Sequence, residues 1–350
     1  MNDTLQRALE IIRTYDGEPI RVMEVCGTHT HENFKLGIRK ILPEKVELIS
    51  GPGCPVCVTA TSYIDESVML ALEKGATVCT FGDLIRVPGT KMSLADARAL
   101  GGKVKVVYTA LDAVAYAKDH PEEQVVFLSV GFETTTPAAL LAVKNAKKDN
   151  LDNFSVLTSN KTMPSAYRAL KDSVDVYLYP GHVNAITGEE ECRKLCEEER
   201  VSGVIAGFNT LELVTAFAVI IENFKKGKPF FVNCYPRVVH PEGSVEAKRL
   251  VTEMTDPEDA EWRGLGVIPN SGVRLKADYA AYDARIKFDL PKVEGKPNPA
   301  CRCGDILQGK CKPYDCKVFG KGCTPEHPIG ACMVSSEGTC AAFYQYGDVK

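Results

Sequence analysis

The sequence predicts an α/β protein with two similar parallel-sheet α/β domains and a third, cysteine-rich domain at the C-terminal end. Three observations predict this fold class. Short apolar runs alternate with segments of helical periodicity, which is typical of βαβ units in a parallel sheet covered on both faces. This alternation restarts near the middle of the chain. Finally, of the 14 cysteines, seven lie in the last fifty residues.

Length and composition are those of an ordinary globular protein. The 350 residues are 45% hydrophobic and 25% charged, which excludes wholesale disorder. The formal charge is −4 and there is no basic block, so we expect no nucleic-acid partner. No apolar stretch approaches the roughly 20 residues of a membrane-spanning helix, and the N-terminus lacks an apolar signal-peptide core. We therefore expect a cytoplasmic protein with no membrane contact.

The first α/β domain is expected over residues 20–145, after an amphipathic helix at residues 4–14. Each expected strand is a short apolar run that ends at a turn, and helical patterns lie between the strands. The strands are 20–25, 46–50, 76–81, 104–109 and 124–130, and the helices are 62–74 and 112–118.

The second α/β domain is expected over residues 146–235. Residues 46–54 (VELISGPGC) align with residues 174–182 (VDVYLYPGH), and each segment is followed by a helix and another strand. This suggests duplicated α/β domains and not a solenoid, whose period would be ~20–50 residues. The strands of this half are 154–158, 174–179 and 201–206, and its helices are 166–171, 189–199 and 211–224.

The third domain is expected over residues 236–350, together with the N-terminal residues 1–19. Few strand patterns and many glycines and prolines occur after residue 236. The last fifty residues cannot bury much apolar area, so they need a covalent or metal staple. Their cysteines are Cys301, Cys303, Cys311, Cys316, Cys323, Cys332 and Cys340.

Metal ligation explains these cysteines better than disulfides do, because the cytosol is reducing. Structural zinc usually binds paired C-x2-C knuckles, and the tail has none. Thiolates dispersed between glycine and proline turns favour a [4Fe–4S] cluster, which would make this an iron–sulfur domain. A zinc-stapled interaction module is the alternative. Seven thiols also exceed the four that a cluster needs.

Two motifs near the N-terminus carry thiols at the ends of expected strands, where open α/β sheets bind ligands. Cys26 begins CGTHTHE, which includes His29 and His31; a helix N-terminus there would lower the thiol pKa. A buried thiol with two surface histidines would also explain this motif. Cys54 and Cys57 have the C-x-x-C spacing of a redox dithiol, although zinc knuckles share it.

Three further loops follow expected strands and combine glycine with polar side chains. Because the carboxyl ends of parallel strands meet at one edge, we expect these loops to line one cleft. Asp83, Glu133 and His182 could orient ligands or shuttle protons there, or they could be helix caps and turn residues. The loops span residues 81–90, 131–137 and 179–188.

The other cysteines have no partner pattern. Cys192 and Cys196 are four apart on one face of an expected helix, where small buried side chains are the usual explanation. Trp262 is a lone indole with no aromatic neighbours in the sequence. The isolated cysteines are Cys79, Cys234 and Cys311.

Taken together, the motifs resemble those of the HypD family of [NiFe] hydrogenase maturation proteins. The matching segments, in this order, are CGTHTHE, GPGCPVC, FGDLIRVPG, GFETTTP, PGHVNAITG and the tail CRCG…DCKVFGKGCTPEHPIGACMVSSEGTCAA. The resemblance spans essentially the whole chain. It implies a hydrogenase maturation factor, a redox-active iron–sulfur scaffold that works with the small chaperone HypC. On it the Fe(CN)2(CO) moiety of the hydrogenase active site is assembled, with cyanide delivered by HypE together with HypF.

The resemblance also implies roles for particular residues. Cys26 would hold the nascent mononuclear iron together with a HypC cysteine, with His29 and His31 in the same catalytic motif. Cys54 and Cys57 would form a redox-active dithiol. The family's cluster spacing of x14, x6 and x16 fits Cys301, Cys316, Cys323 and Cys340. The implied redox pair beside the cluster is Cys303 and Cys332, while Cys311 is an extra thiol.

A free-standing enzyme is the alternative function. In a ferredoxin-linked protein disulfide reductase, the cluster would reduce the Cys54–Cys57 pair for an external disulfide. Both functions use the same cysteines, so the composition does not separate them.

Overall fold

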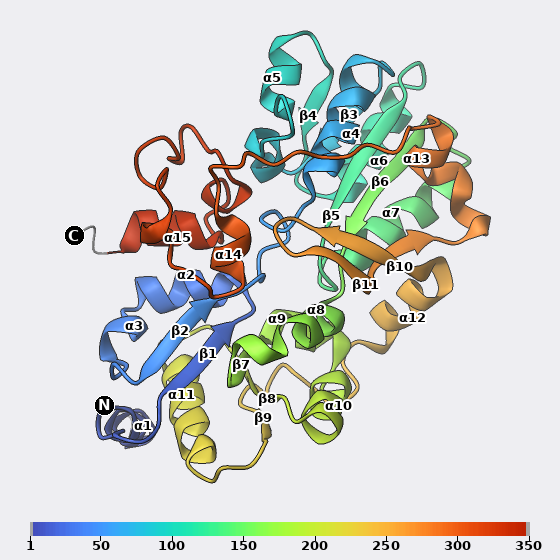
Figure 1. Ribbon diagram of the computed structural model, residues 1–350. Coiled ribbons are helices and arrows are strands. Elements are labelled where there is room, and N and C mark those ends of the chain that lie inside the picture. The colour runs from blue at the N-terminus through green and yellow to red at the C-terminus, as the bar shows by residue number, and fades with distance from the viewer. Residues whose placement is uncertain (1–2, 348–350) are drawn as a thin grey trace.

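Two parallel β-sheets organise the structure, a computed structural model that describes residues 3–347 (Figure 1). The five-stranded sheet has the order β2-β1-β7-β8-β9, with β1 (Ile20–Glu24), β2 (Val46–Ser50), β7 (Val176–Pro180), β8 (Ser202–Ala206) and β9 (Phe231–Asn233). The four-stranded sheet has the order β4-β3-β5-β6, with β3 (Thr77–Thr80), β4 (Val104–Val106), β5 (Val125–Gly131) and β6 (Phe154–Asn160). All neighbouring strands in both sheets are parallel, as the predicted fold class requires.

Sheet membership does not follow the boundaries expected at residues 145 and 235. β1 and β2 share a sheet with β7–β9, so the chain leaves this half after β2 and returns to it at β7. The segments 46–54 and 174–182, which align in sequence, supply β2 and β7, and both strands pair with β1. The two similar segments therefore occupy equivalent strand-to-loop positions on either side of β1 in one sheet.

Helices flank the strands of both sheets. β5, for example, is buried along its whole length, which is typical of a strand covered on both faces. The helices of the five-stranded half are α1 (Asp3–Arg13), α2 (Gly27–Lys35), α3 (Ile38–Ile41), α9 (Gly181–Thr187), α10 (Glu190–Glu199) and α11 (Thr210–Phe224). In the four-stranded half, α4 (Thr61–Leu72) precedes β3. The helices that follow its strands are α5 (Leu94–Ala99), α6 (Ala110–Asp119), α7 (Thr136–Lys148) and α8 (Met163–Leu170).

The N-terminal helix α1 belongs to the five-stranded half. It packs against α11 through an apolar face that includes Ala8 and Ile12. The sequence predicts that residues 1–19 belong with the cysteine-rich domain. In the structure, the apolar face of α1 is instead buried on α11, which offers the apolar surface next to β1.

An antiparallel hairpin, β10 (Thr255–Trp262) and β11 (Gly266–Leu275), follows the helix α12 (Val245–Met254). The sequence predicts few strands after residue 236, and here it is wrong. β10 does alternate between more and less exposed positions, but its TDPEDAEW sequence is rich in residues that strands disfavour. The tip of the hairpin meets the segment after Cys57 through a bridge between Thr59 and Trp262.

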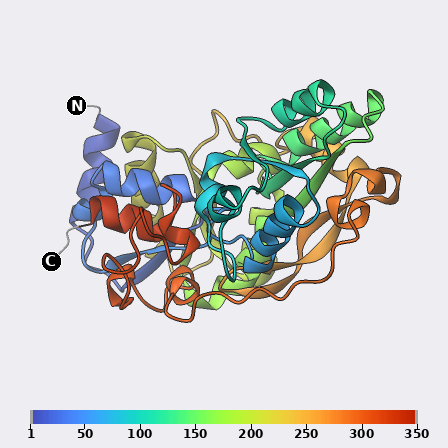
Figure 2. The ribbon, with the colours of Figure 1, turned by 90° about the horizontal axis from the view of Figure 1, so that it is seen from above.

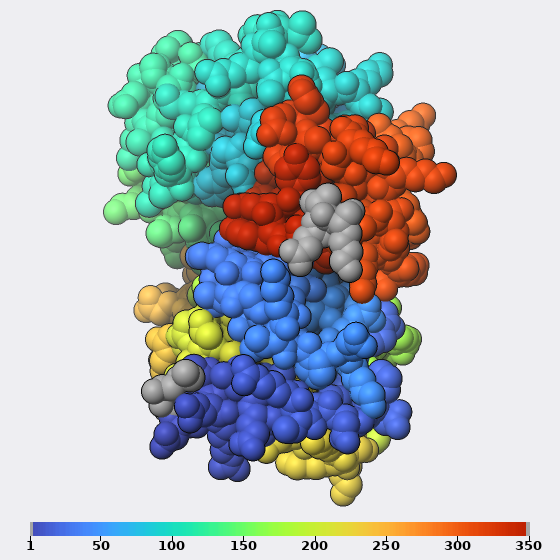
Figure 3. Space-filling view, turned by 90° about the vertical axis from the view of Figure 1, so that its left-hand side faces the viewer, coloured from blue at the N-terminus to red at the C-terminus, as the bar shows by residue number. Residues whose placement is uncertain are grey.

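The C-terminal segment runs from the four-stranded half back to the five-stranded half (Figures 1 and 2). Its helices are α13 (Ala284–Lys287), α14 (Cys303–Leu307) and α15 (Thr339–Tyr346). α15 packs on α2, with the rings of Phe34 and Phe343 4.7 Å apart. In Figure 3 the red C-terminal segment lies between the cyan part of one half and the blue part of the other. The cysteine-rich segment is therefore placed where the two halves meet.

Across residues 3–347, no helix has both the length and the apolar character needed to traverse a lipid bilayer.

Candidate functional site

Four loops gather at the carboxyl edge of the five-stranded sheet, the edge where open α/β sheets bind ligands. Cys26 follows β1, the Gly51–Cys57 turn follows β2, His182 follows β7 and Phe208 follows β8. This placement agrees with the expectation that Cys26 and the C-x-x-C motif lie at a functional edge.

A buried carboxylate network fixes the start of α2. Glu24, at the end of β1, is fully buried. It accepts hydrogen bonds from Thr30 at 3.1 Å, Asn33 at 2.7 Å and Ser50 at 2.9 Å, and it forms an ion pair with Arg39. Because two of these partners lie on α2 itself, Glu24 sets the position of the helix that Cys26 caps.

Cys26 is the N-cap residue of α2 and is 7% exposed. Burial dominates its environment and raises the pKa of Cys26 to about 12, although hydrogen bonds from the backbone of His29 and from Thr28 lower it. The expected low pKa at this helix N-terminus is thus wrong, because desolvation outweighs the helix. The thiol of Cys26 is therefore protonated at neutral pH.

Cys26 and Cys54 lie on touching turns. The backbone nitrogen of Gly27 donates to the carbonyl of Gly53 at 3.0 Å. A Cβ atom on Gly53 would lie 2.2 Å from the backbone nitrogen of Cys26, so only glycine permits this approach. Backbone contacts therefore hold the first thiol beside the C-x-x-C turn.

An aromatic stack forms beside these turns. Phe208 lies between His29 and His182, with ring centroids 4.6 Å and 3.9 Å away. His29 is buried, and its Nε2 lies 3.0 Å from the carbonyl oxygen of Gly207. Burial lowers the pKa of His29 to about 4, so the ring is neutral. If Nε2 donates to that carbonyl, Nδ1 keeps its lone pair, and this buried atom has no hydrogen-bond partner among residues 3–347.

The C-terminal segment closes over α2. Thr28 donates to Oε1 of Glu337 at 2.7 Å, and a Cβ atom on Gly27 would lie 2.6 Å from the Cβ of Glu337. His31 contacts the carbonyl of Ser336 and the hydroxyl of Tyr346, each at 3.4 Å. His31 thus joins the two segments. Glu337 could not be predicted as a site residue from the sequence, because it lies more than 300 residues after Thr28 along the chain.

Cys54 and Cys57 are 4% and 0% exposed. The backbone nitrogen of Cys57 donates to the sulfur of Cys54 at 3.4 Å. Burial raises the pKa of Cys57, and hydrogen bonds with the thiols of Cys332 and Cys54 raise it further. The C-x-x-C motif is therefore in direct contact with the cysteine-rich segment.

Six of the seven tail cysteines line one small cavity: Cys301, Cys303, Cys316, Cys323, Cys332 and Cys340. Within it, Cys332 lies close enough to Cys303 and Cys340, as well as to Cys57, for the thiols to interact, and Cys301 interacts with Cys303 in the same way. Cys311 does not line this cavity. The six tail cysteines to which the resemblance gives a role are therefore brought together.

Backbone atoms of the cavity wall lie close to the sulfur atoms of the cysteines. A Cβ atom on Gly330 would lie 2.4 Å from the sulfur of Cys301. The backbone nitrogen of Ile329 donates to the sulfur of Cys323 at 3.3 Å. Soft thiolate donors, with backbone amides directed at sulfur, suit an iron–sulfur cluster. The residues present therefore fit this cofactor.

The three other polar loops do not converge on one cleft. Asp83 is exposed in a 3-10 turn (Gly82–Arg86). Glu133 accepts a hydrogen bond from the backbone nitrogen of Met163 at 2.8 Å, and its Oε2 is buried. Burial raises the pKa of Glu133 to about 7. Only His182, in the ring stack, lies with the residues around Cys26.

The cysteines before residue 300 that have no partner pattern lie apart from the six-cysteine cavity. Cys79 is buried in the core of the four-stranded half. Cys192 is buried and accepts a hydrogen bond from Asn184 at 3.3 Å, while Cys196, on the same helix, is partly exposed. Cys234 packs at the edge of the other core.

Two further residues, to which the sequence gives no role, lie at the tip of the β10–β11 hairpin: Trp262 and Arg263. Trp262 is fully buried and stacks on Phe132 with ring centroids 5.8 Å apart. Arg263 is 5% exposed and lies close enough to Cys301, Cys303 and Cys332 to interact with them electrostatically. No sequence motif marks it, because it follows a strand that the sequence does not predict.

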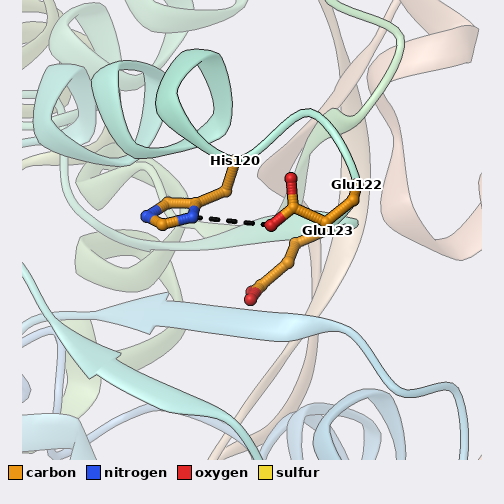
Figure 4. Close-up of side chains that lie close together, drawn as sticks. All are labelled: His120, Glu122 and Glu123. Atoms are coloured by element: carbon orange, nitrogen blue, oxygen red, sulfur yellow. Dashed lines mark ion pairs between the residues drawn. The ribbon is translucent and has the colours of Figure 1, made fainter.

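A second group of possible metal ligands lies after α6, where His120, Glu122 and Glu123 approach one another (Figure 4). Nδ1 of His120 is 3.7 Å from Glu122. Glu123 already accepts a hydrogen bond from Thr77 and pairs with Lys103 at 3.2 Å. These interactions account for the group, and we assign no metal to it.

Comparisons with known proteins identify the family of this chain. Residues 3–347 match the HypD family, described as "Hydrogenase formation hypA family". The hydrogenase maturation factor HypD2 of Bradyrhizobium diazoefficiens is 42% identical over 342 residues, covering 94% of this chain and 90% of the relative. HypD of Cupriavidus necator is 42% identical, covering 95% and 91%. HypD of Escherichia coli is 40% identical, covering 94% and 89%. The chain therefore belongs to the HypD family of hydrogenase maturation factors.

Proposed function

We propose that this protein is a redox-active iron–sulfur scaffold on which, together with a HypC-type chaperone, the Fe(CN)2(CO) moiety of the [NiFe] hydrogenase active site is assembled. The observation that carries the proposal is the continuous set of thiols. It runs from the C-x-x-C turn beside Cys26 into the six-cysteine cavity.

Cys26 is the proposed ligand of the iron that is being assembled. Low-spin iron with cyanide and CO needs soft thiolate donors. The thiol of Cys26 loses its proton when iron binds, and its hydrogen bonds from Thr28 and His29 then stabilise the thiolate. His29, with its buried Nδ1 unpaired among the described residues, can orient a ligand. A cysteine of the chaperone supplies the second thiolate in this proposal.

The cavity is the proposed cluster site. Cys301, Cys316, Cys323 and Cys340 would hold a [4Fe–4S] cluster, which supplies electrons one at a time when it is bound. Cys303 and Cys332 line the same cavity and would be the adjacent redox pair. Cys332 contacts Cys57 directly, so it is the residue that connects this cavity to the C-x-x-C motif.

Cys54 and Cys57 are the proposed dithiol. As two thiols they can release two electrons and two protons and close a disulfide, and the reverse change restores them. This gives the Cys26 site a local means of maintaining the oxidation state of its iron. Cyanide would arrive from HypE acting with HypF, and assembly would take place in the cytoplasm.

The experiment is infrared spectroscopy of the anaerobically purified complex with the HypC-type chaperone. We expect Fe–CN and Fe–CO bands in the wild type and their loss in Cys26→Ala, since that change removes a ligand of the iron. Cys196→Ala, a partly exposed thiol on α10, is the matched control and should keep the bands. Bands that persist unchanged in Cys26→Ala would refute Cys26 as the ligand.

The contact between Cys57 and Cys332 also suits the second candidate, a ferredoxin-linked protein disulfide reductase. Catalysed reduction of a protein disulfide by the isolated chain would favour that candidate. Capture of iron only in the presence of the chaperone would favour the scaffold.

A further inference from the structure

Arg263 is a buried cation at the meeting point of three segments. Its backbone nitrogen donates to the carbonyl of Val58 at 2.9 Å, and its Nε donates to the carbonyl of Thr59 at 2.8 Å. Its Nη2 donates to the carbonyl of Pro88 at 2.8 Å. The hairpin tip is thereby fixed to the segment that follows Cys57 and to the 81–90 loop. Gly264, the next residue, packs so closely that its Cβ would lie 2.4 Å from the Cα of Gly304.

The guanidinium of Arg263 lacks a carboxylate partner. Among residues 3–347, its hydrogen bonds go to carbonyl oxygens and no ion pair joins it to an acid. Two partly buried arginines of this chain differ: Arg285 pairs with Glu66 at 2.8 Å, and Arg39 pairs with Glu24. A buried charge without a counter-charge is costly. The missing negative charge therefore needs an explanation.

The cysteine cavity supplies that negative charge. Arg263 lines one pocket together with Cys301 and Cys303. These two thiols and Cys332 also act on its charge more strongly than the acid Asp65 does. As thiols these side chains are neutral, but as ligands of iron or as redox thiolates they are negative. Asp65 is itself engaged by the backbone and hydroxyl of Thr90, at 2.8 and 2.6 Å.

We propose that Arg263 is the counter-charge of the cysteine cavity, a positioning residue that stabilises the negative charge of a reduced iron–sulfur cluster bound there. This inference rests on the proposed function, because it requires the cavity to bind the cluster. A cation held a short way from the cluster favours the added electron, and it acts strongly because water is excluded. Removing the charge therefore shifts the midpoint potential of the cluster to lower values.

The test is a redox titration of the anaerobically purified full chain, followed by its visible and electron paramagnetic resonance spectra. Arg263→Gln should keep the cluster and lower its midpoint potential. Lys91→Gln is the matched control. Lys91 is exposed on the outer pocket that Arg263 also lines, so water screens its charge and the potential should not change. A cluster-loaded Arg263→Gln protein with the wild-type potential would overturn the proposal.

Arg263→Lys decides the case in which Arg263→Gln does not fold or does not load the cluster. Lysine keeps the charge but cannot donate to both carbonyl groups in the same way. Charge compensation predicts a loaded cluster near the wild-type potential. If Arg263 only holds the three segments together through its hydrogen bonds, Arg263→Lys should fail to fold or to load the cluster, as Arg263→Gln does. That result would refute the role of Arg263 as a counter-charge. A wild-type protein with no cluster would contradict the proposed function itself, so the two failures are distinguishable.

Discussion

The buried thiol of Cys57, in the turn after β2, lies close enough to the thiol of Cys332 in the C-terminal segment for the two to interact. This contact joins the N-terminal motifs to the cysteine cavity. The C-terminal segment reaches it because α15 packs on α2 and the hairpin tip packs on Val58 and Thr59. The cysteines that follow β1 and β2 and those of the C-terminal segment therefore form one connected site, although they are far apart in the sequence.

The role of the C-x-x-C motif can be separated from cluster binding. Cys57→Ala removes the thiol that contacts both Cys54 and Cys332, but it leaves the cavity cysteines in place. We expect normal cluster absorbance and loss of hydrogenase maturation in a host strain that lacks its own HypD. Cys54→Ala should behave in the same way, and Cys196→Ala should mature hydrogenase normally. Normal maturation in both Cys54→Ala and Cys57→Ala would exclude the redox role.

The close approach of backbone to sulfur at Gly330 should matter for the cluster. A methyl group there would lie 2.4 Å from the sulfur of Cys301, so Gly330→Ala must displace that ligand. We expect substoichiometric iron and sulfide after anaerobic reconstitution. Gly322→Ala is the matched control in the same segment, because its Cβ meets nothing closer than Ile329, at 3.7 Å. Equal cluster content in the two variants would contradict this account of the cavity.

The network around Glu24 should be essential for stability. Glu24→Ala leaves Arg39 and Asn33 without their buried acceptor, and a broken buried ion pair costs about 3–5 kcal/mol of unfolding free energy. Denaturant unfolding of the metal-free protein measures this loss. Glu32→Ala, on the partly exposed side of α2, removes only a surface pair with Lys35 and should cost less than about 1 kcal/mol. Similar losses for both variants would show that the Glu24 network does not fix α2.

Glu133 should make stability depend on pH in a defined direction. Its carboxyl is buried and its folded pKa, about 7, is above the ordinary 4.5, so the folded state binds a proton more tightly than the unfolded state. Its favourable contribution is therefore complete below pH 4.5 and is lost as the pH rises through 7, at about 1.4 kcal/mol per pH unit. Glu133→Gln, which can still accept from Met163, should gain stability relative to wild type between pH 5 and pH 8. A pH-independent difference between the two proteins would contradict the assigned pKa.

Much of the fold can be predicted from local sequence, because apolar runs and helical periodicity are local properties. β2 begins and ends at the predicted residues, and α4, α6, α10 and α11 lie within two residues of the predicted bounds. The allocation of strands to sheets could not be predicted, because parallel pairing joins β1 to β7 across more than 150 residues. The β10–β11 hairpin was also missed, since its strands are stabilised mainly by pairing with each other and by burial of Trp262.

The candidate site shows the same division. The thiol motifs at Cys26, Cys54 and Cys57 are visible in the sequence because each follows a recognisable strand. Glu337 and Arg263 are not, because they reach the site only through the folding of distant segments. The high pKa of Cys26 also depends on burial in the folded protein and, to a smaller extent, on the charge of Glu337, and no local pattern reveals either.

The most direct test of the central claim is the Mössbauer spectrum of the 57Fe-enriched, anaerobically purified protein, recorded alone and in complex with its HypC-type chaperone. The account predicts a [4Fe–4S] cluster in the chain alone and an additional low-spin mononuclear iron in the complex. A colourless protein that contains zinc and no cluster iron would contradict the assignment of the cysteine cavity. A complex that holds only cluster iron would contradict the assignment of Cys26.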